Sequence, residues 1–111
     1  MTKTNIKNLP EGNYFTEIMY SDSHAWQEIK RTAKTVTVRR VAVDTDPEWI
    51  SKRQFLPGGF HGHVPNQSEQ TWIFKGFDSR IATIRLTKRG WAYKGTRFVE
   101  GLAREFHDYN L

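Results

Sequence analysis

The sequence has no cysteine, which excludes disulfide bonds and thiolate metal sites within its 111 residues. Disulfide-free chains are typical of reducing compartments, so we expect a cytoplasmic protein. No apolar run approaches the roughly 18 residues that a membrane-spanning helix needs, and the mean hydropathy is −0.70. Residues 1–13 also lack the apolar centre of a secretory signal. We therefore expect neither a membrane partner nor export.

Acidic residues are missing from two parts of the chain that are rich in Lys and Arg. One part includes residues 30–40, and the other runs from residue 79 to residue 99. The formal net charge is +5 and the sequence pI is about 9.7. This balance favours an anionic partner, such as nucleic acid, a nucleotide phosphate or an acidic protein surface. The open alternative is that the charge only keeps the protein in solution.

Several short segments alternate with period two, which predicts a mainly β protein. The strongest is Thr35–Val43, where Val36 and Val38 fall on one face and Val41 and Val43 on the other. Turn residues separate the expected strands, which cover residues 14–20, 25–30, 35–43, 71–77, 81–87 and 91–93. We therefore expect a small antiparallel sheet or an SH3-like or OB-like barrel of five to six strands.

The length fits one domain, which we place at residues 14–111 behind a flexible N-terminal tail at 1–13. Pro and Gly residues predict a long irregular loop over 51–70. Just before it, Asp46 and Pro47 predict a capped helical turn.

The segment 96–111 is ambiguous between helix and strand. Phe98, Leu102 and Phe106 recur every four residues, which favours a short C-terminal helix. Gly101 in its middle opposes that helix by about 1 kcal/mol.

No constellation of residues predicts catalysis, a metal site or a cofactor. His61 and His63 form the best metal-like pair, but no third ligand stands at a fixed spacing, so we interpret them as loop histidines. The run Ser21-Asp22-Ser23-His24 is more typical of a turn than of a catalytic group. We therefore predict a protein that is not an enzyme and needs no cofactor.

Basic side chains with aromatic neighbours are the strongest functional signal. Cations that follow a phosphate backbone, beside rings on which bases stack, are typical of single-strand binders. The alternative is a solvated sheet face with the rings in the core. The predicted nucleic-acid-binding residues are Lys30, Arg31, Lys34, Arg39, Arg40, Arg85, Lys88 and Arg89, with Trp26, Trp91 and Tyr93 as stacking residues.

Four strings resemble a group of small uncharacterised tailed-bacteriophage proteins. They are YSDSHAW from Tyr20, KTVTVRRV from Lys34, IRLTKRGW from Ile84 and the closing REFHDYNL from Arg104. The resemblance implies a phage accessory protein in the cytoplasm of an infected bacterium. It implies no particular chemistry.

A second function stays open beside nucleic-acid or nucleotide binding. By analogy with phage accessory proteins, the chain would be a protein-binding inhibitor of a host defence system, of the anti-CRISPR or another anti-defence type. The anchors to a host protein would then be Trp49, Phe55, Phe60 and Trp72. The sequence does not separate the two functions and does not fix the oligomeric state.

Overall fold

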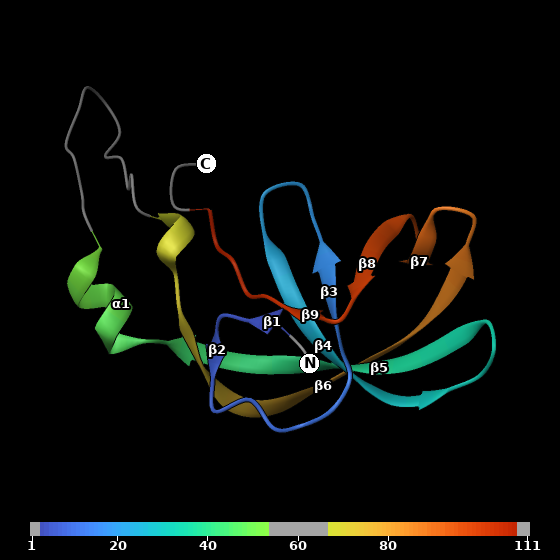
Figure 1. Ribbon diagram of the computed structural model, residues 1–111, viewed down its shortest axis with the longest axis horizontal. Helices are drawn as coiled ribbons and strands as arrows, with labels where there is room; N and C mark the ends of the chain where they lie inside the picture. The colour runs from blue at the N-terminus through green and yellow to red at the C-terminus, as the bar shows by residue number, and fades with distance from the viewer. Residues whose placement is uncertain (1–2, 54–66, 109–111) are drawn as a thin grey trace.

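The structure is a computed structural model that describes residues 3–53 and 67–108, most of them in strands (Figure 1). The elements in chain order are β1 (Lys3–Thr4), β2 (Ile6–Lys7), β3 (Tyr14–Ile18), β4 (Ser23–Arg31), β5 (Thr35–Thr45), α1 (Pro47–Lys52), η1 (Gln67–Glu69), β6 (Trp72–Thr87), β7 (Gly90–Tyr93), β8 (Thr96–Glu100) and β9 (Leu102–Ala103). The prediction of a mainly β protein is confirmed.

Six strands form a ring of antiparallel pairs. Their order is β6-β5-β4-β3-β8-β7, and β7 pairs back with β6 through Arg85↔Ala92 and Leu86↔Trp91. Strand β2 adds to the outer edge of β6 as a parallel strand. The C-terminal half of β6 pairs with β5 on one side and with β7 on the other. It therefore has no free edge at which another chain could pair.

Strands β5 and β6 are the two longest elements and run side by side along one edge of the view (Figure 1). Their pairing has irregularities between Arg39 and Val41 and between Ala42 and Val43. An irregularity of this kind bends a strand and changes which side of the sheet its next residues face. Each strand therefore serves the barrel with one half and a second core with the other.

Both faces of the central strands are buried, each against its own core. Neighbouring residues divide between the cores, because successive side chains of a strand point to opposite faces. Phe15, Trp26, Val36, Val38, Ala82, Ile84 and Phe98 form the barrel core. Ile6, Tyr14, Ala25, Val41 and Ala103 form the outer core, with Trp72, Phe74 and Phe77 packed on it.

Residues 3–7 pair with the rest of the sheet, which differs from the expected tail. Strand β1 is parallel to β9, and Ile6 beside Trp72 is only 3% exposed. The Asn5 side chain donates to the backbone carbonyls of Gln70 and Glu105 at 3.1 and 2.7 Å. A side-chain amide that bonds distant backbone leaves no apolar period in the sequence, so the pattern did not predict this strand.

The C-terminal segment forms strands β8 and β9 instead of the helix that was the open alternative. Gly101 separates them with φ of +83°, a left-handed conformation that ends regular structure. Buried Thr16 holds this turn of chain in place, because its hydroxyl donates to the Leu102 carbonyl at 2.7 Å and accepts from the Arg104 amide at 3.0 Å. The spacing of Phe98, Leu102 and Phe106 therefore did not reflect a helix.

The expected helical turn after Asp46 is present as α1. The Asp46 side chain accepts from the Glu48 amide, and Pro47 occupies the first turn. No helix in the described ranges is long and apolar enough to cross a membrane. Of the predicted loop at 51–70, residues 54–66 lie outside the described part, and residues 67–69 form the single turn η1.

Truncation of Ile84 should test the barrel core. Ile84 is fully buried in that core, whereas Ile81 on the same strand is 63% exposed. We expect Ile84→Ala to lower the free energy of unfolding by about 2–5 kcal/mol, because it removes buried methyl groups and leaves a cavity. Ile81→Ala should change it by no more than about 0.5 kcal/mol. Urea unfolding of both variants measures the difference, and equal losses would contradict the barrel core.

Asp46 should make stability depend on pH in the acid range. Hydrogen bonds from Lys7 and then Thr71 lower the pKa of Asp46 from 3.8 to about 2. A carboxyl whose pKa is lowered on folding stabilises the fold fully above its unfolded pKa and loses that contribution as pH falls through the folded pKa. We therefore expect part of the stability to disappear between about pH 4 and pH 2.

The matched control is Asp46→Asn, which keeps the helix cap but has no charge to titrate. Urea unfolding of parent and variant from pH 5 to pH 2 should show a steeper fall for the parent. Parallel curves would mean that Lys7 does not stabilise the Asp46 carboxylate.

Candidate nucleic-acid interface

Two turns that carry cations lie at one end of the barrel, and a third lies at the opposite end of the short strand β7. They are the β4–β5 turn, the β6–β7 turn and the β7–β8 turn. The Leu86 amide donates to the Lys34 carbonyl at 2.9 Å, which ties the first turn to β6. Across the strands, Arg85 is opposite Ala92, and Ala92 is opposite Arg97. These pairs place the side chains of Arg85 and Arg97 on one face of the sheet.

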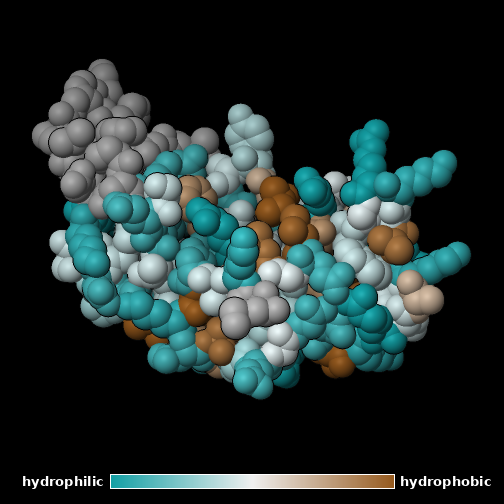
Figure 2. All heavy atoms as spheres, in the orientation of Figure 1, coloured by the Kyte–Doolittle hydropathy of each residue, from teal (hydrophilic) through white to brown (hydrophobic). Residues whose placement is uncertain are grey.

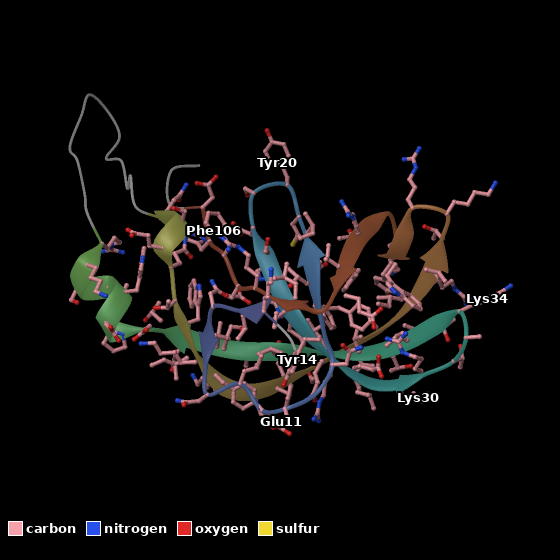
Figure 3. The ribbon with its side chains drawn as sticks, in the orientation of Figure 1. Glu11, Tyr14, Tyr20, Lys30, Lys34 and Phe106 are labelled. Carbon is pink, nitrogen blue, oxygen red and sulfur yellow. The ribbon has the colours of Figure 1, made fainter. Side chains whose placement is uncertain are left out.

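We call this surface the basic end and define it by Lys34, Arg85, Lys88, Arg89, Lys94 and Arg97. Each of the six is exposed, and no described carboxylate lies within ion-pair distance of any of them. No acidic residue occurs from residue 79 to residue 99. Lys34 projects from its turn at this end (Figure 3), where hydrophilic side chains also stand out from the surface (Figure 2). Because these six like charges share one surface, they produce a positive field around it.

A hollow of about 380 Å³ lies between the β6–β7 and β7–β8 turns. Its volume falls in the range of small-ligand pockets. Two cations border it, while the Trp91 ring turns toward the barrel core and packs on Phe15 at a centroid distance of 6.0 Å. The lining residues are Thr87, Arg89, Trp91, Ala92, Gly95 and Arg97.

The β7–β8 turn holds a lysine in a strained conformation. Lys94 and Gly95 have φ values of +49° and +82° between the paired residues Tyr93 and Thr96. Two positive φ angles define the type I′ turn, for which Asn-Gly is the preferred sequence. A lysine in this position loses stability relative to Asn, while it places one more cation beside the hollow. Its ammonium lies 5.4 Å from the centre of the Tyr93 ring.

Five of the predicted contacts are at the basic end, namely Lys34, Arg85, Lys88, Arg89 and the half-buried Trp91. Tyr93, 36% exposed, belongs to its β7–β8 turn. Lys30 is exposed on β4, which is separated from the strand of Arg97, β8, by β3. Sequence reasoning left Lys94 and Arg97 out of the predicted contacts, although the acid-free run at 79–99 contains both.

Arg31 is neutralised by two carboxylates. Its guanidinium lies 2.7 Å from Glu28 and 2.6 Å from Glu100, and the hydrogen bond to Glu28 is the main cause of its raised pKa. It also lies over the Trp91 ring, 5.4 Å from its centre. Arg31 therefore covers Trp91 and gives little net charge to the basic end.

Three other predicted contacts lie away from this surface. Trp26 is 6% exposed in the barrel core and donates to Glu17 at 3.1 Å, so it is not a stacking platform. Arg39 donates two hydrogen bonds to Gln27 and lies 3.7 Å over the Phe77 ring. Arg40 is buried beside Glu105. These assignments were wrong for a surface role because alternation in β4 and β5 turns the side chains inward or to the other face.

The anchors expected for a host protein are also poorly placed where the structure describes them. Trp49 is 3% exposed, and Trp72 packs on the outer core. Phe55, Phe60, His61 and His63 lie outside the described residues. In the part of the chain that is described, no group of three or more His, Asp or Glu side chains is arranged to hold a metal ion.

No protein-family model, curated protein or solved structure matches this chain. The resemblance to phage accessory proteins therefore stays a prediction.

Replacement of Lys94 by Asn should separate stability from charge at the basic end. We expect Lys94→Asn to raise the free energy of unfolding by about 0.5–1 kcal/mol, because Asn adopts the left-handed conformation at lower cost. Lys88→Asn is the control: it removes the same charge from an exposed turn residue without positive φ. Thermal unfolding of both variants checks this. An equal or larger gain for Lys88→Asn would show that charge relief, and not turn strain, is responsible.

Proposed function

We propose that the protein binds single-stranded nucleic acid at the basic end. The observation that carries the proposal is the set of six exposed cations without described carboxylate partners, two of which, Arg89 and Arg97, border a hollow. Phosphates pair with Lys and Arg by releasing bound counterions, which favours binding at low and moderate salt.

The choice of a single strand rests on the hollow beside Trp91. A strand with unpaired bases can turn one base into the hollow while its phosphates follow the surrounding cations. Arg89 and Arg97 border the same hollow, so a phosphate on either side of that base has a cation within reach. A duplex keeps its bases stacked inside, so a hollow of this kind offers it nothing beyond the charge.

The pairing of Arg31 with Glu28 and Glu100 supports a narrow site. These carboxylates lie next to the basic end but are occupied by Arg31. Arg31 offsets one of the two negative charges, and the charge that remains bounds the site on this side. The interaction surface is then limited to the three turns and the outer face between Arg85 and Arg97.

The test replaces Lys88, Arg89 and Arg97 together by Gln. The net charge falls from +5 to +2, because three positive charges are removed. Binding to a fluorescent single-stranded oligonucleotide should weaken strongly. The slope of log K against log salt should also decrease by about 2, at roughly 0.7 per single-strand phosphate contact.

The control replaces Lys3, Lys52 and Arg53 by Gln, which gives the same net charge while leaving the basic end intact. It should keep the parent's affinity and salt slope. Equal weakening of both triple variants would show that only overall charge matters. Failure of the parent to bind DNA or RNA oligonucleotides at physiological salt would overturn the proposal.

A further inference from the structure

A second cavity, of about 560 Å³, lies where β5 and β6 leave the barrel, away from the basic end. The smallest pair in the ladder, Ala42 opposite Gly76, is in this stretch, and Ala42 lines the cavity. The walls include apolar residues of both strands. The complete lining is Arg40, Val41, Ala42, Val43, Trp72, Lys75, Phe77, Asp78, Arg80 and Glu105.

Charged groups of opposite sign stand together in the buried part of this cavity. The side chains of Arg40 and Glu105 are 11% and 9% exposed, and their nearest charged atoms are 3.7 Å apart. The other Glu105 contact is His24, whose Nδ1 lies 2.8 Å from the same carboxylate oxygen, Oε2. Burial lowers the pKa of Arg40, and the charge of Glu105 partly restores it.

The hydrogen bonding of this pair is incomplete within the described protein. Arg40 Nε, Glu105 Oε1 and the indole Nε1 of Trp72 are buried without a hydrogen-bond partner, and all three residues line the cavity. Buried polar atoms are nearly always paired, because an unpaired one costs about 1–3 kcal/mol. These three atoms have almost no accessible surface, so a ligand in the cavity pairs with them only when their side chains turn toward it.

The outer part of the cavity carries exposed cations. Lys75 and Arg80 have side chains that are 64% and 66% exposed, and they pair with Asp44 at 3.8 Å and with Asp78 at 2.9 Å. Exposed ion pairs of this kind contribute little net energy. An anionic group can therefore replace either carboxylate as the partner of the cation.

From this arrangement we infer that the cavity binds a mononucleotide. Turned toward the cavity, the Arg40 guanidinium and the Glu105 carboxylate offer a donor next to an acceptor, which matches a base edge that presents an acceptor next to a donor. The apolar walls suit the faces of a flat ring, and Lys75 and Arg80 are placed to receive the phosphate. The cavity volume is within the usual range of small-molecule sites.

Titration calorimetry with the four ribonucleoside 5′-monophosphates tests the inference, with ribose 5-phosphate, inorganic phosphate and free glutamate as comparison probes. At least one nucleotide should bind about tenfold more tightly than ribose 5-phosphate, which has the phosphate but no base edge. Equal binding of nucleotide and ribose 5-phosphate would reduce the site to a phosphate contact. Tighter binding of glutamate would replace the nucleotide by an amino acid, and the absence of any binding would end the proposal.

Two variants locate the binding without disturbing the buried charges. Ala42→Met adds a larger side chain to the lining of the cavity and should abolish nucleotide binding, while Arg80→Gln should weaken nucleotides but leave the corresponding nucleosides unchanged. Lys30→Gln, which removes an exposed cation that lines neither hollow, is the control and should bind nucleotides like the parent. Circular dichroism confirms that each variant is folded. A folded Ala42→Met protein with the parent's affinity would overturn the inference.

Discussion

The structure depends on strand β6, which pairs with β5 in both of its halves and with a second strand that differs between the halves. Its C-terminal half pairs with β5 on one side and with β7 on the other, which closes the barrel. Its N-terminal half pairs with β5 and with β2, which places Ile6 beside Trp72 and builds the outer core. A single long strand thus joins two cores, and the irregular pairing along β5 lets each half face its own core.

Two-sided burial decides which cations reach the surface. Where β4 and β5 are covered on both faces, Arg39 and Arg40 are held by Gln27, Phe77 and Glu105. At the three turns of the basic end the cations stay exposed. The same run of basic residues in the sequence is therefore divided between a surface field and a buried ion pair. The two sites that we propose follow from this division.

Periodicity predicted much of the fold, because alternation of apolar residues reflects burial directly. The strands around Val36, Val38 and Ile84 are confirmed, as is the helix cap at Asp46. The N-terminal strands were missed, since they depend on Asn5 side-chain hydrogen bonds to backbone about a hundred residues away in the chain. The C-terminal strands were ambiguous because Phe98 and Phe106 share a helical spacing by coincidence.

The sequence by itself determined the class of the protein: a small basic β domain without cysteine, with an acid-free segment at 79–99. These properties follow from composition and local pattern, which need no knowledge of distant contacts. Only the tertiary structure decided that Arg31 is neutralised by Glu28 and Glu100, that Trp26 is core, and that Arg40 meets Glu105 at a cavity. Apart from the contact of Arg31 with Glu28, three residues away, these outcomes require residues far apart in the chain to meet. Charge and hydropathy along a sequence do not specify which partner a side chain finds.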